Sequence, residues 1–252
     1  MRKYLLAALL FAAAMPCVAD QQKSIADVYR EANQFLRKKD YKDAETAYTR
    51  AIEMNQSYET FFYGRAEARF GRRDWDGVLA DTAKALALNP KSPKAYKALC
   101  LRGEVFAEKK DFKSALGEFG RAIAMKPGSA EAYAGLADVY SKKDYSGNRR
   151  IQKALANYTE AIRLDSAEDR YYVLRSKAYF AESLYKESIA DYDQAIRLNP
   201  RNDDAFAGRG VSRFVLSDYR AALGDFRRAI EINPGLKTIL ENFIEQAERM
   251  TS

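Results

Sequence analysis

Hydrophobic residues recur at three- and four-residue spacing along most of this chain, and the clearest example lies between Asp203 and Pro234. Both halves of that segment carry an apolar stripe of the kind that one buried helical face produces. The stripes consist of Phe206, Ala207, Gly210, Val211 and Phe214, then Tyr219, Ala222, Leu223, Phe226, Ala229 and Ile230. Asp218 offers a carboxylate that can cap the second helix, and Pro234 ends that helix because proline cannot continue it. Two such short helices cannot bury both stripes alone, so the segment needs neighbours.

Five earlier copies of the same pattern supply those neighbours. The residues at the terminal position are Gln56, Pro90, Pro127, Ser166, Pro200 and Pro234, at intervals of 34, 37, 39, 34 and 34. Five residues earlier the chain always has alanine, as Ala51, Ala85, Ala122, Ala161, Ala195 and Ala229. Where the first helix crosses the second, the residue is small in every copy: Ala32, Ala66, Gly103, Ala137, Ser176 and Gly210. Large aromatic residues accompany them as Tyr48, Phe119, Tyr158, Tyr192 and Phe226.

This combination of small, aromatic and proline positions resembles the tetratricopeptide repeat, whose period is about 34 residues. The resemblance implies an all-α protein, a right-handed superhelical solenoid of six helix pairs that is closed by a C-terminal capping helix. The expected repeats span about 25–56, 59–90, 93–127, 130–166, 169–200 and 203–234, and the capping helix spans 235–250. Gln56 and Ser166 depart from the pattern because they replace the closing proline, and Leu184 replaces the capping aspartate.

Three local features modify the repeats. Ser92-Pro93 is a good helix start, so the first helix of the third repeat is expected to begin nearly a turn early. Five extra residues near 146–150 include Gly147-Asn148, which predicts a protruding loop inside the fourth repeat. The capping helix is expected to bury one face, which consists of Leu236, Ile239, Leu240, Phe243, Ile244 and Ala247.

The first nineteen residues have the plan of an export signal. Arg2 and Lys3 precede an apolar run, and small residues ending at Ala19 offer a cleavage site. Residues 1–19 are therefore expected to be removed, leaving 20–252 as a single domain in the bacterial periplasm. Lipid anchoring through Cys17 is the alternative, although Pro16 stands where lipoprotein signals usually have a small residue.

The composition restricts the chemistry. The chain contains no histidine, which excludes imidazole catalysis and histidine metal sites. Cleavage after Ala19 would leave Cys100 as the lone cysteine, so no internal disulfide could form. The carboxylates of Glu67, Glu104 and Asp138 come from successive repeats, which places neighbours about 10 Å apart. That spacing is wider than in glycosidases, so we expect no enzyme and no cofactor.

In tetratricopeptide-repeat proteins the first helices line a concave groove that holds a peptide or a partner helix. When the groove positions of the family are mapped onto this sequence by the resemblance, the middle of the groove is acidic and both ends carry aromatic residues. The candidate groove residues are Tyr29, Asn33, Tyr63, Glu67, Phe70, Lys97, Cys100, Glu104, Asp138, Arg170, Lys177 and Phe180. They suit a ligand with a basic centre and apolar anchors, but a solvated face with incidental charge explains the same residues. Cys100 is also explained as a small hydrophobic residue of the core.

The carboxylate clamp of co-chaperones is not supported, because Tyr29, Gly64 and Leu101 replace three of its five polar groups.

A second pattern lies in the turns between paired helices, where basic pairs should align as a basic edge. Its members are Lys38, Lys39, Arg72, Arg73, Lys109, Lys110, Lys142, Lys143, Arg149 and Arg150. Cations at a helix's last turn stabilise the negative end of its dipole. Contact with an anionic envelope surface is the functional alternative.

The sequence therefore predicts a non-enzymatic periplasmic scaffold that binds a protein or peptide in its concave groove. The alternative is a self-associating envelope component that acts through its basic edge or its C-terminal helix. Nucleic acid is not an expected partner, because no base-stacking motif accompanies the positive charges. The full chain carries a formal net charge of +7.

Overall fold

The computed structural model describes residues 24–142, 145 and 150–251, which form thirteen α-helices, one short 3-10 turn at Pro234–Leu236 and no β-strand. The first twelve helices form six consecutive pairs, which agree with the predicted repeats. These are α1 Ile25–Arg37 and α2 Tyr41–Met54, α3 Glu59–Gly71 and α4 Trp75–Leu88, α5 Ala95–Glu108 and α6 Phe112–Met125, α7 Ala130–Ser141 and α8 Arg150–Leu164, α9 Asp169–Ala181 and α10 Tyr185–Leu198, α11 Asp203–Val215 and α12 Tyr219–Ile232. The predicted signal with Cys17 and most of the predicted loop, 146–149, lie outside the described residues.

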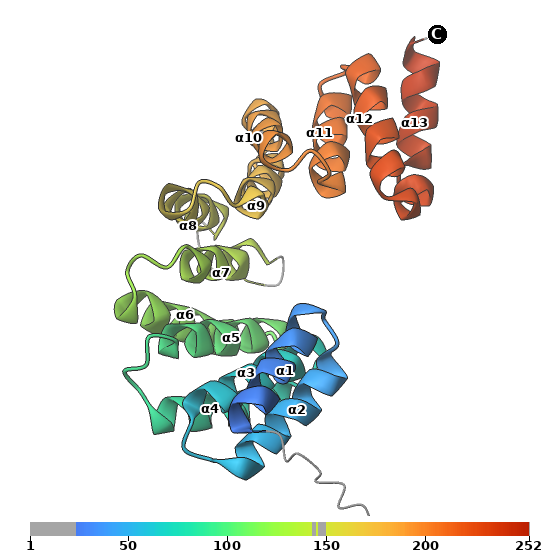
Figure 1. Ribbon diagram of the computed structural model, residues 1–252. Helices are drawn as coiled ribbons and strands as arrows, with labels where there is room; N and C mark the ends of the chain where they lie inside the picture. The colour runs from blue at the N-terminus through green and yellow to red at the C-terminus, as the bar shows by residue number, and fades with distance from the viewer. Residues whose placement is uncertain (1–23, 143–144, 146–149, 252) are drawn as a thin grey trace, which may run out of the picture.

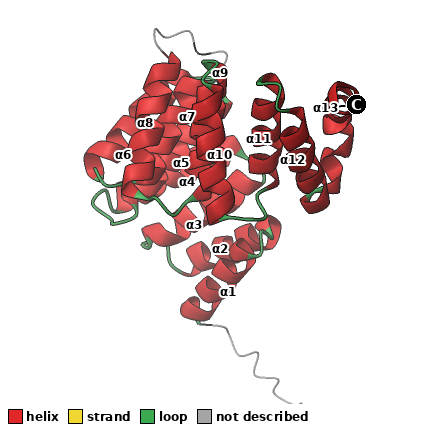
Figure 2. Ribbon diagram, turned by 90° about the horizontal axis from the view of Figure 1, so that it is seen from above, coloured by secondary structure: helices red, strands yellow, loops and turns green. Residues whose placement is uncertain are grey.

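The helix pairs stack one after another into a curved solenoid (Figure 1). Seen from above, α11, α12 and the last helix, α13 (Lys237–Thr251), stand to one side of the stack that α4 to α8 form (Figure 2). Each helix packs mainly against the helices that precede and follow it in the chain. The all-helical solenoid expected from the repeats is therefore confirmed. Within the described residues, no helix is both long and apolar enough to span a membrane.

The turn inside each pair has a repeated backbone conformation. Its second residue adopts a left-handed φ near 60° in five repeats, at Lys39, Arg73, Lys110, Ser183 and Ser217. The N–H of the next residue then reaches back to the first helix, as from Asp111 to the Phe106 carbonyl at 2.8 Å, which is the bond of a Schellman helix end. In several repeats that next residue also caps the second helix, as where Asp74 accepts from the Gly77 N–H at 3.0 Å. Leu184 keeps the backbone bond to the Tyr179 carbonyl and lacks only the side-chain cap.

The small and aromatic positions pack as the sequence predicts. All six alanines of the invariant position are buried, and Ala51, Ala122, Ala161, Ala195 and Ala229 are 0% exposed. The ring of Phe119 on α6 lies against small residues of both adjoining first helices. A Cβ added to Gly103 would lie 2.8 Å from the Phe119 ring, and one added to Gly135 would lie 2.2 Å from it. Close approach of backbone to ring therefore holds α6 between α5 and α7.

Two predictions about helix boundaries and faces are wrong. Pro93 lies in the turn before α5, which begins only at Ala95, so the extra residues of the third repeat lengthen the turn and not the helix. The Ser92 side chain donates to Glu59 at 3.0 Å and accepts from the Lys94 N–H, which stabilises the turn. In α13, Leu240 and Ala247 are buried as predicted, but Ile239 is 67% exposed.

Buried arginine–carboxylate pairs join the helices of four repeats, a feature that the sequence analysis did not identify. Each joins residues sixteen apart, one on the first helix and one on the second: Arg65–Asp81, Arg102–Glu118, Arg175–Asp191 and Arg209–Asp225. The Arg175 guanidinium contacts both oxygens of Asp191 at 2.7 Å and also reaches Thr159 of the preceding repeat at 3.0 Å. These bonds fix the angle between helices within a repeat and join it to the preceding one.

Candidate functional site

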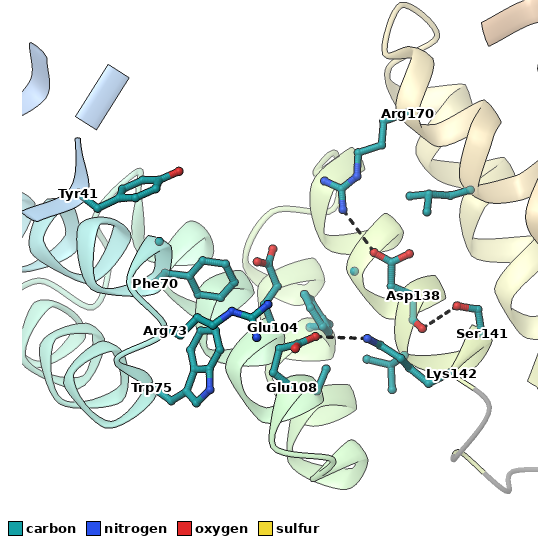
Figure 3. Close-up of a pocket in the computed structure, with 16 residues that line it drawn as sticks. Tyr41, Phe70, Arg73, Trp75, Glu104, Glu108, Asp138, Ser141, Lys142 and Arg170 are labelled. Atoms are coloured by element: carbon teal, nitrogen blue, oxygen red, sulfur yellow. Dashed lines mark hydrogen bonds and ion pairs between the residues drawn. The ribbon is translucent and has the colours of Figure 1, made fainter. Parts of the chain in front are cut away.

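A cleft of about 690 Å³ opens between the second and fifth repeats. Figure 3 shows its walls: the corner between α3 and α4 lies on one side, α7 and α9 lie on the other, and α5 lies between them. The first wall supplies Phe70, Trp75 and Arg73, and the other walls supply the carboxylates and two more cations. The principal side chains are Phe70, Trp75, Glu104, Glu108, Asp138 and Arg170.

The aromatic wall forms at the turn between α3 and α4. Phe70 lies in the last turn of α3, and Trp75 begins α4, with their ring centroids 5.3 Å apart in an edge-to-face arrangement. Arg73 lies between them with φ 61°, the left-handed conformation that closes α3. The turn thus brings two rings and one guanidinium together at the rim of the cleft (Figure 3).

Two of the three carboxylates that line the cleft already have cationic partners. Glu108 contacts the ammonium group of Lys142 at 3.3 Å, and Asp138 lies 3.6 Å from the guanidinium of Arg170. Asp138 also accepts a hydrogen bond of 2.5 Å from the Tyr158 hydroxyl. Burial raises the pKa of Asp138, while the hydrogen bond from Tyr158 and the charge of Arg170 oppose that rise.

Glu104 differs from its neighbours. No described residue forms a hydrogen bond or an ion pair with its carboxylate, which projects into the cleft between Phe70 and Asp138 (Figure 3). Burial, followed by the negative charges of Glu131, Asp138 and Glu108, raises its pKa to about 7, and Arg170 only partly offsets them. The cleft therefore contains a carboxyl group with a raised pKa and with no hydrogen-bond or ion-pair partner among the described residues.

Glu67 lies on α3 at the position equivalent to Glu104, but it does not line the cleft. Its carboxylate accepts a hydrogen bond of 3.0 Å from Tyr63, whose ring packs against the core. Burial raises the pKa of Glu67, and the Tyr63 hydroxyl and the nearby ammonium groups of Lys97 and Lys94 oppose this. Glu131, which was not among the predicted groove residues, lies in the first turn of α7 and adds negative charge near Glu67 and Glu104. The three acids predicted in a row thus lie on successive first helices, but only Glu104 and Asp138 share the cleft.

The remaining groove candidates are placed elsewhere. Asn33 donates to the Tyr29 carbonyl at 2.7 Å and accepts from the Tyr48 hydroxyl at 3.1 Å, so it connects α1 to α2. Cys100 is 0% exposed, and burial raises the pKa of its thiol, so it does not present a reactive group to a ligand.

The two candidates of the fifth repeat also have contacts of their own. Lys177 is 3.1 Å from Asp204 of the next repeat. The ring of Phe180 packs on Tyr185 at a centroid distance of 5.1 Å. This contact corresponds to the one between Phe70 and Trp75, but it lies at a turn outside the cleft. The aromatic residues of the cleft rim are therefore Phe70, Trp75 and Tyr41, of which the sequence identified only Phe70.

Several members of the basic edge form ion pairs with the repeat before them. Arg72 contacts Glu45, Lys109 lies 2.9 Å from Asp76, and Lys142 lies 3.3 Å from Glu108. Arg150 donates to the carbonyls of Ser141 and Lys142. Lys38 and Lys39 are exposed, whereas Lys143 and Arg149 lie outside the described residues. The basic pairs thus connect successive turns as well as complementing the helix dipoles.

No cluster of acidic and cysteine side chains in the described residues could hold a metal ion. The site therefore consists of aromatic rings, the Arg73 guanidinium, one carboxylate that no described residue pairs, and two carboxylates with cationic partners. Such a site can bind a cationic and apolar group, but no described pair of its residues forms an acid and a nucleophile in contact.

Sequence models of known families match the same repeats. A sequence model described as tetratricopeptide repeat matches residues 29–93 and 63–130, and one described as TPR repeat matches residues 177–216. The comparison with curated proteins found no match.

Three of the similar solved structures share the fold at low sequence identity. MamA is 19% identical with a TM-score of 0.56, covering 69% of this chain and 96% of its own. YrrB, described as a TPR protein with an unusual peptide-binding site, is 22% identical with a TM-score of 0.55, covering 81% and 98%. The pilF protein of Pseudomonas aeruginosa is 14% identical with a TM-score of 0.66, covering 89% and 96%. Together with the helix pairs and the invariant small positions, these matches show that the chain belongs to the tetratricopeptide-repeat proteins.

Proposed function

We propose that this protein is a non-enzymatic interaction scaffold whose cleft holds an extended segment of a partner protein. The observation that carries the proposal is the cleft itself, where the Phe70–Trp75 wall faces the carboxylate of Glu104, which no described residue pairs. Because stacked repeats hold these groups at fixed separations, binding requires little ordering of the protein. The peptide-binding site ascribed to YrrB gives a precedent on the same fold.

The chemistry of the cleft favours a segment with a basic residue between apolar residues. Apolar side chains would cover Phe70 and Trp75, and the basic side chain would meet Glu104. Exposed ion pairs contribute little individually, so most of the affinity is expected from the aromatic wall, with the acid selecting the segment. Phe70→Ala should accordingly weaken binding more than Glu104→Gln, whereas Glu104→Lys should repel the partner.

We propose the periplasm of a bacterium as the location, because residues 1–19 have the plan of a cleavable export signal. A lipid anchor at Cys17 is the alternative. Mass spectrometry of the mature protein distinguishes them: a chain beginning at Asp20 supports export with cleavage after Ala19, and an acylated Cys17 supports the anchor.

The experiment that tests the scaffold function is capture of partners from an envelope extract on immobilised wild-type protein, with Phe70→Ala as the matched control. Loss of the same captured proteins from the control column is expected. Equal capture by both columns would show that partners do not use the cleft. Circular dichroism confirms beforehand that the control variant retains its helices.

A second candidate, self-association through α13, has one observation in its favour. Ile239 and Met250 are 67% and 63% exposed on that helix, although the sequence placed Ile239 on the buried face. Light scattering over a range of concentrations tests it, and a concentration-independent monomer would exclude it. An Ile239→Gln variant should dissociate any oligomer that forms through this face.

We also propose contact of the basic edge with an anionic envelope surface, through those members that ion pairs do not already occupy. Replacing the exposed Lys38 and Lys39 together with Lys109 and Lys110 by glutamine should abolish binding to phosphatidylglycerol vesicles while leaving helicity intact. If the wild-type protein ignores such vesicles even at low ionic strength, where screening is weakest, the edge has only a structural role.

A further inference from the structure

Glu104 is the one acid of the cleft that its described surroundings leave unsatisfied. Glu108 has Lys142 at 3.3 Å, and Asp138 has the Tyr158 hydroxyl at 2.5 Å and Arg170 at 3.6 Å. No described residue bonds to the Glu104 carboxylate, although it lines a cleft of about 690 Å³. Burial without a partner disfavours the ionised form of a carboxylate, and a cation that enters from outside can stabilise that form.

The groups that face Glu104 from each surrounding element do not supply such a cation. They are Arg73 from the α3–α4 turn, Cys100 and Glu108 from its own helix, Glu131 and Asp138 from α7, Lys142 from the end of α7, Arg170 from α9, and Tyr41 from α2. Lys142 and Arg170 are paired with other carboxylates, and Arg73 lies at the rim without an ion pair to Glu104. The local charge therefore favours the protonated form when the cleft is empty.

We infer that the cleft exchanges the proton of Glu104 for a lysine or arginine side chain of its occupant, so that the scaffold holds its partner at neutral to alkaline pH and releases it in acid. This inference depends on the proposed function, because it concerns the occupant of the same cleft. Phe70 and Trp75 lie beside Glu104, so the methylene groups of such a side chain can cover the rings while its charge reaches the carboxylate. Protonation removes the charge that attracts the cation but leaves the apolar contacts in place.

The size of the effect follows from the titration of Glu104 in the empty cleft. Its pKa of about 7 means that about half of the carboxylates are ionised at pH 7 and about a tenth at pH 6. If the ionised form binds a lysine-containing segment about tenfold more tightly than the protonated form does, affinity for that segment falls about fivefold between pH 8 and pH 6. An uncharged segment of the same shape should show no such dependence.

The fluorescence of Trp75, the single tryptophan of the chain, reports binding directly because its ring lines the cleft. The probes are a capped pentapeptide of phenylalanine, alanine, lysine, alanine and phenylalanine, and its counterpart with norleucine in place of lysine. At pH 8 the lysine peptide should bind about tenfold more tightly, as a charge-assisted contact in a partly buried site predicts. At pH 5.5 the two dissociation constants should converge.

The Glu104→Gln variant should bind both peptides alike at every pH. Glu67→Gln is the matched control, because Glu67 occupies the same position on the preceding first helix, is also partly buried and lies outside the cleft. It should keep the preference for lysine and its pH dependence. Thermal melts at pH 8 verify that both variants are folded.

The outcomes separate this inference from the proposed function. Equal, pH-independent binding of both peptides to wild-type protein overturns the inference and leaves the scaffold function standing. The inference is also overturned if pH dependence persists in Glu104→Gln. A Trp75 signal that responds to neither peptide at millimolar concentration counts against the peptide-binding cleft and the inference together. In the absence of peptide, NMR titration of the Glu104 carboxyl carbon should give a midpoint near neutrality, and a midpoint in the ordinary glutamate range contradicts the exchange.

Discussion

Removal of the Asp81 carboxylate should destabilise the second repeat more than any surface change on the same helix. Asp81 lies on α4 with a side chain only 4% exposed, and it accepts three hydrogen bonds from two guanidinium groups. Arg65 donates to its two oxygens at 2.9 and 2.7 Å, and Arg69 donates at 2.9 Å. In Asp81→Ala both arginines lose this partner, although Arg69 keeps Glu45 and Arg65 keeps Thr49.

The magnitude follows from how far the arginines can be rehydrated. Breaking a buried ion pair from one side costs about 3–5 kcal/mol, because the remaining charge stays buried. The side chains of Arg65 and Arg69 are 14% and 21% exposed, so water can reach them in part. We therefore expect a loss at the lower end, about 3 kcal/mol of unfolding free energy. Asp76→Ala on the same helix removes the pair with Lys109, but Asp76 is 87% exposed, so its loss should be below about 1 kcal/mol.

Urea unfolding that is followed by circular dichroism and by Trp75 fluorescence measures both effects. Trp75 begins the helix that carries Asp81, so it reports the local transition even if the repeats do not unfold as one unit. Replacing both partners by apolar residues, as Arg65→Met together with Asp81→Leu, should recover part of the loss because the second charge is removed as well. If Asp81→Ala and Asp76→Ala destabilise equally, the buried pairs do not stabilise the repeats as argued.

Three further outcomes are expected. Ala195→Leu should lower the unfolding free energy by about 1–3 kcal/mol, because Ala195 is 0% exposed and extra methylene groups would force α10 away from its neighbours; a melt identical to wild type would contradict the repeat register. Ser183→Gly should raise stability by up to about 1 kcal/mol, since Ser183 has φ 61°, whereas Ser183→Val should lower it, and both are measured by thermal denaturation. Burial raises the pKa of Glu104 to about 7 from its ordinary value of 4.5, so the stability it contributes is fully present below pH 4.5 and is lost as pH rises through 7. Glu104→Gln should therefore be more stable than wild type at pH 8 and equal to it near pH 4, and the opposite order in urea melts would refute the assignment.

The spacing of residues along the chain determined the fold. Alanine stands at the position of Ala195 in every repeat, and a large aromatic residue such as Tyr192 precedes it by three positions in all repeats but the second. Stacked helix pairs are the arrangement that buries the apolar stripes of both helices in each repeat. The repeat boundaries follow from the same positions, since small residues must meet wherever two helices cross. These are local and periodic constraints, so a single sequence reveals them.

Only the tertiary structure decided how polar residues are paired. Glu67, Glu104 and Asp138 look equivalent in the sequence, yet Tyr63 satisfies the first, Arg170 and Tyr158 satisfy the third, and Glu104 has no partner among the described residues. The partners lie at different intervals from the acids, four residues away for Glu67 and on other helices for Asp138. No periodic rule can therefore assign them.

The aromatic wall of the cleft illustrates the same limit. Phe70 and Phe180 occupy equivalent positions, and each packs on the first aromatic residue of the next helix, Trp75 or Tyr185. Only the former pair lines the cleft, because the curvature of the solenoid brings α3, α5, α7 and α9 around one space. Curvature accumulates from small rotations between successive repeats, which depend on side-chain packing across every interface. The sequence thus determined the repeating unit, and packing between units decided where the site lies.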